Sequence, residues 1–230
     1  MDPVLTELQQ LCSWLLALTH ETMQREEAGD ASHDYDHIVR VIALADILQE
    51  REGGELPIIW AAVALHDIGQ ERERRHGGDH ALIGADMAAD LLTNTQFPQH
   101  AIPAVQEAIR EHRMTGGIIP HTVEGRILYD ADKIDCLGAI GIGRLYCITG
   151  RYNQKIYSTL APDIVEPVDP LVVRELRRSP DYSPSIEFRL LFDNLPERMT
   201  TVSGRVLAQE RYEYMANFFS RLQKEIEGNL

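Results

Sequence analysis

Cysteine is scarce in this chain of 230 residues, which has only Cys12, Cys136 and Cys147. The number is odd, and each of the three lies in apolar sequence. A disulfide framework needs paired cysteines and a zinc cluster needs closely spaced ones, so the sequence predicts neither. We expect three reduced thiols in the core of a cytoplasmic protein.

A long hydrophobic run is also missing. A membrane-spanning helix needs about 18 to 20 consecutive apolar residues, and no window of the sequence approaches that length. The first residues include Asp2 and Glu7, where a secretory signal would carry lysine or arginine. We therefore expect neither a membrane span nor a secretory signal.

Basic residues are the third shortage, with 22 Lys and Arg against 36 Asp and Glu and a net charge of -14. Binding to a nucleic acid polymer needs a basic stripe that displaces counterions, and docking on an anionic membrane needs basic clusters. The sequence predicts neither partner. A small anionic substrate is compatible with this charge if a bound metal reverses the local field.

What the sequence does contain is helical periodicity, because apolar residues recur every three or four positions along most of it. The predicted class is all-α, without internal repeats. Asp34 or Ser32 can cap the second helix, and the charged segment 70–78 is predicted to be a loop. The helices are predicted near residues 4–18, 38–48, 58–65, 79–92, 99–113, 123–137, 139–148, 185–195 and 203–226.

Residues 150–184 differ from the rest, with five of the eleven prolines and little periodicity. This pattern predicts an irregular proline-rich excursion or flap rather than an inter-domain linker. The predicted organisation is therefore a single domain over residues 1–230. Its core covers about residues 20–150, followed by the flap at 150–184 and C-terminal helices at 185–230.

The pair His66-Asp67 ends the apolar run 58–65. A run of that kind belongs in a core, so the imidazole and the carboxylate come to its edge and need a hydrogen-bond partner or a metal. Gly69 follows as the residue expected just past a helix C-terminus. By itself, the pair is explained as well by a satisfied helix end as by a functional site.

Histidine distribution favours the functional interpretation, because eight of the nine histidines lie between residues 33 and 121. Helical spacing turns several of them inward: His112 continues the apolar stripe of Val105 and Ile109. Any one of them alone is more often a core residue bonded to a carbonyl. Together with His66-Asp67 they predict a metal site, formed by His37, His66, Asp67, His80, His112 and Asp132. We expect His20, His76, His100 and His121 at the surface.

Imidazole and carboxylate together suit zinc, iron, manganese, nickel or cobalt. Four of the six ligands, His37, His66, Asp67 and Asp132, suffice for one ion. Adding His80 and His112 gives enough for two ions about 3.5–4 Å apart, with Asp67 as the bridge. The predicted cofactor is thus one or two divalent transition-metal ions that acidify a bound water for attack on phosphorus.

In their order and on their helices, His37, His66-Asp67 and Asp132 resemble the H…HD…D signature of the HD-domain metal-dependent phosphohydrolase superfamily. The similarity to its small bacterial hydrolases covers residues 33–41, 64–68, 124–135, 137–144 and 199–219. The resemblance implies an HD-type helical bundle and a metal-dependent phosphohydrolase in which these four residues bind metal. Some members of that branch hydrolyse nucleoside triphosphates to monophosphates with manganese.

His80 and His112 depart from that branch and resemble the extra ligands of dinuclear HD proteins. Those include cyclic-dinucleotide phosphodiesterases, dinucleoside-polyphosphate hydrolases and a few diiron oxygenases. The substrate is therefore predicted only as a nucleotide or another small phosphate ester. A diiron oxygenase on the same scaffold and a non-catalytic nucleotide-binding sensor are the alternatives, and assembly into a homo-oligomer is left open.

Three further residues are predicted to act on the substrate. Arg40, one turn after His37, can reach a phosphate with two hydrogen bonds, although a surface arginine explains it equally well. Lys133, directly after Asp132, can neutralise a phosphate oxygen or protonate a leaving group. His33 is expected to support a metal ligand or to contact substrate rather than to bind metal itself. The predicted catalytic residues are Asp67, Lys133 and Arg40, and the predicted substrate-binding residues are His33, Arg40 and Lys133.

Overall fold

The structure, a computed structural model, describes residues 3–26, 34–93, 95–113, 119–159, 176–177 and 179–229. All regular structure in these ranges is helical, which confirms the predicted all-α class. The chain divides into two compact units, Met1–Asp132 and Lys133–Leu230. The single domain over residues 1–230 stays a prediction. None of the described helices is long and apolar enough to cross a membrane.

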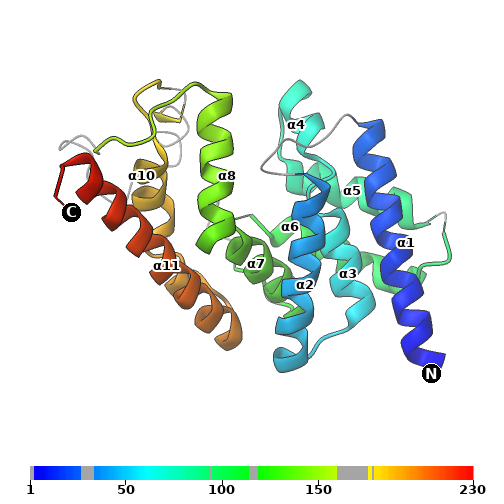
Figure 1. Ribbon diagram of the computed structural model, residues 1–230. Helices are drawn as coiled ribbons and strands as arrows, with labels where there is room; N and C mark the ends of the chain where they lie inside the picture. Colours follow the sequence, from blue (N-terminus) through cyan, green and yellow to red (C-terminus); the bar gives the residue numbers. More distant parts are fainter. Residues whose placement is uncertain are drawn as a thin grey trace. The chain divides into compact units, whose positions relative to one another are not determined.

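The first unit is built around one fully apolar helix, α3 (Leu56–Leu65). It packs against α1 (Pro3–Arg25), α2 (Tyr35–Glu52), α5 (His80–Thr93) and α6 (Ile102–Glu111), as Figure 1 shows. Every residue from Ile58 to Leu65 is buried, as expected for a helix that is hydrophobic all round. The residues that follow α3 therefore begin inside the unit.

The entry into α2 is fixed by a side-chain cap. Asp34 Oδ1 accepts a hydrogen bond from the backbone N–H of His37 at 2.9 Å, which is the bond expected of an N-cap residue. Asp34 is thus the cap, and the alternative, Ser32, lies outside the described residues. The cap places His37 in the first turn of α2.

The prediction of a loop over residues 70–78 is wrong, because this segment contains the short helix α4 (Gln70–His76). Its glutamine, glutamates and arginines are good helix formers. Glu71 is buried, and Arg74 and Arg75 lie 2.8 and 2.6 Å from its carboxylate oxygens, one turn further along the helix. The helix stops at Gly77, whose φ of 77° favours glycine.

Glycine is needed at position 69 for close packing and not, as expected, to end α3. Its φ of -83° is ordinary helical backbone, so it is not a left-handed cap past α3. A Cβ on Gly69 would collide with the carbonyl oxygen of His80 and would lie 2.6 Å from the amide nitrogen of Gly84. The turn after α3 therefore packs directly against the backbone of α5. Gly84, which has no side chain, permits this approach.

The second unit contains the end of α7 (Val123–Asp135), with α8 (Gly138–Arg151), α10 (Pro184–Glu187) and α11 (Val202–Ile226). The helix predicted over 185–195 is not continuous. It forms the single turn α10, the π-helical turn η2 (Phe188–Phe192) and, further on, the 3-10 turn η3 (Pro196–Arg198). Phe188 opens the π turn and stacks on Phe219 of α11, with ring centroids 4.9 Å apart. Local periodicity cannot anticipate such a packing-driven change of helix type.

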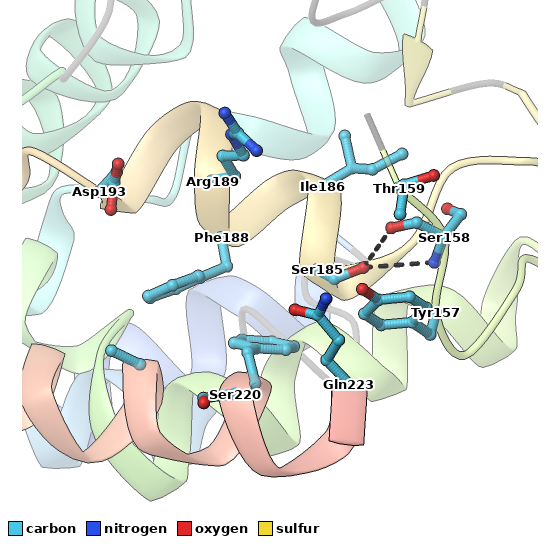
Figure 2. Close-up of a pocket in the computed structure, with 12 residues that line it drawn as sticks. Tyr157, Ser158, Thr159, Ser185, Ile186, Phe188, Arg189, Asp193, Ser220 and Gln223 are labelled. Carbon is cyan, nitrogen blue, oxygen red and sulfur yellow. Dashed lines mark hydrogen bonds between the residues drawn. The ribbon is translucent and has the colours of Figure 1, made fainter. Parts of the chain in front are cut away.

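The predicted flap at 150–184 is described only in part, because residues 160–175 and 178 lie outside the described ranges. Its described ends are irregular. Ser158 donates through its backbone N–H to Ser185 Oγ at 3.3 Å, and Ser185 Oγ donates to the carbonyl of Ser158 at 2.7 Å. A cavity of about 490 Å³ lies beside this contact, and Figure 2 shows the residues that line it. Residues that line it include Tyr157, Phe188, Arg189, Phe219 and Gln223.

All three cysteines are free thiols, but the prediction that they lie in the core is wrong for Cys147, which is exposed. Leu145 and Thr149, four residues apart, occupy the buried side of α8. Cys147 stands midway between them and so faces the opposite side of the helix. Cys12 and Cys136 are half-buried.

Candidate metal centre

Five of the six predicted metal ligands meet inside the first unit. His37 comes from the first turn of α2, His66 and Asp67 directly follow α3, His112 directly follows α6, and Asp132 lies in α7. Their exposed fractions are 0% for His37 and His66, 9% for Asp67, 2% for His112 and 7% for Asp132. Buried imidazoles and carboxylates at this density need a shared partner.

Two sets of three side chains have ligand atoms that all lie within 4.8 Å of one another: His37, His66 and Asp132, and His66, Asp67 and His112. In the first set, His37 Nε2 lies 3.5 Å from Asp132 Oδ1. In the second, His66 Nε2 lies 3.4 Å from Asp67 Oδ2. Two atoms that each bind an ion at about 2.1 Å lie about 3.4 Å apart at a tetrahedral angle. These separations therefore suit a common cation.

The rings of His66 and His112 are oriented by their own helices. His66 Nδ1 lies 2.8 Å from the carbonyl oxygen of Val63, and His112 Nδ1 lies 2.6 Å from that of Ile109. A carbonyl can only accept, so Nδ1 carries the hydrogen in both rings. In the neutral imidazole, Nε2 then holds the lone pair that binds metal.

His66 Nε2 provides the sharpest test of whether this centre fits a metal. It is completely buried and makes no hydrogen bond with any described residue. The Asp67 and Asp132 carboxylate oxygens lie 3.4 and 3.9 Å from it, beyond good hydrogen-bond geometry. A divalent cation would satisfy this nitrogen and both carboxylates at once, so the residues present fit one.

The negative charges around His66 also favour a cation at this position. Burial acts to lower the pKa of His66, but the Asp67 and Asp132 carboxylates outweigh it and raise the pKa from 6.5 to about 9. Without metal, a proton on His66 thus takes the place of a cation. Metal binding must displace that proton.

The two sets share His66, which has only Nε2 to offer because Nδ1 is bound to Val63. His66 can therefore serve one ion. Asp67, in contrast, presents two oxygens to different partners: Oδ2 lies 3.8 Å from His37 Nε2, and Oδ1 lies 3.8 Å from His112 Nε2. This is the arrangement that a bridging carboxylate requires, and the predicted bridging role of Asp67 rests on it.

His80, the sixth predicted ligand, lies beside the cluster but is in neither set of ligand atoms. Its ring centroid is 5.2 Å from that of His112. Its Nδ1 lies 2.6 Å from Oε2 of Glu73 on α4. Its role as a ligand stays a prediction. Glu73 is a residue that sequence reasoning missed, because nothing distinguishes it from the other charges of residues 71–75.

The residues predicted to contact substrate are placed as follows. Arg40 is half-buried in α2, one turn after His37. Lys133 is buried and follows Asp132 in α7, as the first residue of the second unit. His33 lies outside the described residues. Their roles stay predictions.

Asp135, three residues after Asp132 in α7, has a partner in the second unit. The Arg144 guanidinium lies 2.9 Å from Asp135 Oδ2, and both side chains are buried in the second unit. Asp135 thus forms a buried ion pair with an arginine of α8.

With this geometry in place, comparison with known proteins shows what the chain is similar to. Residues 34–137, which contain all six predicted ligands, match the HD domain family model. The resemblance to HD-domain proteins predicted from the sequence is thus confirmed. Over its length, the chain is also similar to YpgQ, an uncharacterized protein of Bacillus subtilis. The two are 24% identical over 228 residues, which are 97% of this chain and 96% of YpgQ.

Solved structures show the same fold. A predicted HD superfamily hydrolase from an uncultured Thermotogales bacterium is 27% identical, with a TM-score of 0.64 over 98% of this chain and 99% of that one. An HD-superfamily hydrolase from Bacillus thuringiensis is 26% identical, with a TM-score of 0.68 over 96% and 98%. Bacillus subtilis YpgQ in complex with ADP is 23% identical, with a TM-score of 0.67 over 97% and 100%.

Proposed function

We propose that this protein is a metal-dependent phosphohydrolase that acts on a nucleotide or another small phosphate ester. The observation that carries the proposal is the buried His66 Nε2, which makes no hydrogen bond with any described residue and stands between two carboxylates. The likeness to HD-superfamily hydrolases supports the reaction class. The YpgQ–ADP complex, a relative with a bound nucleotide, supports the substrate class.

The residues that would hold a first cation are His37, His66, Asp67 and Asp132. Asp67, His112 and His80 would hold a second. A bound divalent cation supplies a Lewis acid and a water acidified to near neutrality. The protein's own part is to fix the ligand lone pairs through the Val63 and Ile109 carbonyls and to keep bulk water away from them.

Charge explains why such a chain needs the cation to bind a phosphate. Asp67 and Asp132 are buried carboxylates, in a chain whose net charge is -14. An anionic substrate is repelled by them unless a cation reverses the local field. Arg40 and Lys133 are proposed to add positive charge on the substrate side, with Lys133 also able to give a proton to a leaving oxygen.

The test is hydrolysis by the variants Asp67→Asn and His66→Gln, assayed with manganese, zinc, nickel, cobalt and iron(II) on nucleoside tri- and diphosphates and cyclic dinucleotides. Elemental analysis gives the metal content. A cation supplies several kcal/mol of transition-state stabilisation, so we expect kcat/KM to fall by about 10³-fold or more. His121→Gln, at an exposed histidine, is the matched control and should keep full activity.

Three results would overturn the proposal. Full activity of Asp67→Asn on the best substrate would show that the metal centre takes no part in hydrolysis. Tight nucleotide binding without turnover, in fully metal-loaded protein, would instead identify a sensor. Iron content with substrate-dependent oxygen uptake would identify an oxygenase.

A further inference from the structure

A histidine–carboxylate pair stands beside the metal centre. His80, the first residue of α5, has Nδ1 2.6 Å from Oε2 of Glu73 on α4. The two side chains are 15% and 31% exposed. An ionised carboxylate only accepts, so Nδ1 carries the hydrogen, and in the neutral ring Nε2 holds the lone pair. Glu73 thus keeps the hydrogen of His80 on Nδ1, as the Val63 and Ile109 carbonyls do for His66 and His112.

Glu73 is itself held in place. Its Oε1 lies 3.8 Å from Arg113 Nη1, and the same nitrogen lies 2.9 Å from Asp79 Oδ2. Asp79 in turn accepts the backbone N–H of Ala81 at 2.9 Å. The network therefore joins the residue after His112 to the residues on either side of His80.

The second cation position lacks a ligand without His80. Because His66 Nε2 can bind only one ion, a cation held with His37 and Asp132 leaves two candidate ligands of the second set, Asp67 and His112, among the described residues. Asp67 Oδ1 and His112 Nε2 lie 3.8 Å apart there. His80, whose ring neighbours that of His112, is the imidazole next to this position.

We propose that Glu73 is a positioning residue: it sets the tautomer and orientation of His80, so that Nε2 of His80 completes a second cation position with Asp67 and His112. The proposal rests on the metal centre of the proposed function. Carboxylates that orient a ligating histidine typically contribute 10- to 100-fold to metal affinity. Glu73 would therefore govern how many ions the protein holds, while the first ion depends on residues that it does not touch.

The experiment is a Mn²⁺ titration of the chelator-treated full-length protein, followed by calorimetry and by the electron paramagnetic resonance signal of a coupled manganese pair. Wild type is expected to show a tight and a weaker ion. Glu73→Gln keeps the size of the side chain but removes its charge. It should weaken the second ion by about 10- to 100-fold and leave the affinity for the first unchanged. At Mn²⁺ concentrations that saturate wild type, the pair signal should be lost.

The matched control is Glu107→Gln. Glu107 Oε1 lies 3.2 Å from His121 Nε2, an exposed pair of the same type elsewhere in the unit. This variant should bind both ions as wild type does. His80→Gln should reproduce the effect of Glu73→Gln, and the double variant should lose no more than either single one, because both act through one bond.

Several results would overturn the inference. One is a wild type that binds a single Mn²⁺ at saturation; hydrolysis with that one ion would then leave the proposed function standing. Another is a Glu73→Gln protein with unaltered second-ion affinity. A third is equal weakening of both ions, which would show a general structural role. If Glu73→Gln fails to fold, additive losses in the His80→Gln and Asp79→Asn variants would contradict the network.

Discussion

At the scale of single residues, the centre depends on where each imidazole keeps its proton. His66 and His112 each bond a carbonyl three residues earlier in the chain, so their tautomers are fixed by local sequence and by the end of their own helix. His80 instead uses a carboxylate of another helix. The first arrangement follows from helix geometry, whereas the second exists only because α4 and α5 meet.

The stability of the metal-free protein is expected to fall as the pH rises from about 6.5 to about 9. The fold raises the pKa of His66 from 6.5 to about 9, chiefly because Asp67 and Asp132 outweigh the effect of burial. A raised pKa means that the folded state favours the proton. The stabilisation is therefore complete below pH 6.5 and is lost as the pH rises through 9. Denaturant unfolding in chelator at several pH values measures this.

The proton on His66 also makes metal affinity depend on pH, in the opposite sense to the stability of the metal-free protein. Because a cation must displace it, metal affinity should rise with pH over the same window. Comparison with His66→Gln isolates this residue from other titrating groups, since the variant should lose the downward slope of metal-free stability. A metal-free wild type with the same slope as the variant would contradict the assignment.

At the scale of elements, the turn after α3 packs closely against the first turns of α5. Gly69 and Gly84 have no side chains between them, and a Cβ on Gly84 would lie 3.2 Å from the carbonyl oxygen of His66. This close approach lies one turn along α5 from His80. It depends on two glycines fifteen positions apart, whose meeting cannot be read from their local spacing.

Gly69→Ala is expected to lower the free energy of unfolding by about 1–3 kcal/mol, the usual range for overpacking. The φ of Gly69 suits alanine, so the cost is steric and comes from the collision with the backbone of His80 and Gly84. Urea unfolding measures it. Gly143→Ala, in α8 with open space around the added Cβ, is the control and should be neutral or stabilising by up to about 1 kcal/mol. Equal effects of the two substitutions would contradict the close approach.

Sequence patterns predicted most of the helices because each buries its own apolar stripe. They failed where long-range packing decided the outcome. The α4 segment has no apolar stripe, so its sequence predicts a loop, and the π turn at Phe188–Phe192 interrupts a helix predicted from a regular apolar pattern. Cys147 was placed inside because its neighbours are apolar, although it faces away from the buried side of α8.

At the scale of the whole molecule, the two compact units raise the question of how cooperatively the chain unfolds. Both tryptophans, Trp14 and Trp60, belong to the first unit. Their fluorescence therefore reports on the unit that holds the metal centre. Far-UV circular dichroism reports on helices of both units.

Metal should raise the unfolding midpoint detected by tryptophan. A ligand at 100 times its dissociation constant stabilises the folded state by about 2.7 kcal/mol, and removal of the metal with chelator should reverse the shift. Coincident fluorescence and dichroism transitions would support the predicted single domain over residues 1–230, and separate ones would support two. An unchanged fluorescence midpoint at metal concentrations that sustain activity would contradict the centre.

The sequence by itself determined the all-α class, the buried helix that ends at His66-Asp67 and the candidate metal ligands, because helical spacing and burial are local properties of the chain. Only the tertiary structure decided how the candidate ligands are arranged: His66 offers Nε2 alone, Asp67 presents its two oxygens to different histidines, and His80 lies beside Glu73. It also showed why residue 69 is glycine, because a Cβ there would collide with the backbone of α5. These features depend on distances between helices that are far apart in sequence, and those distances are fixed by how the helices pack.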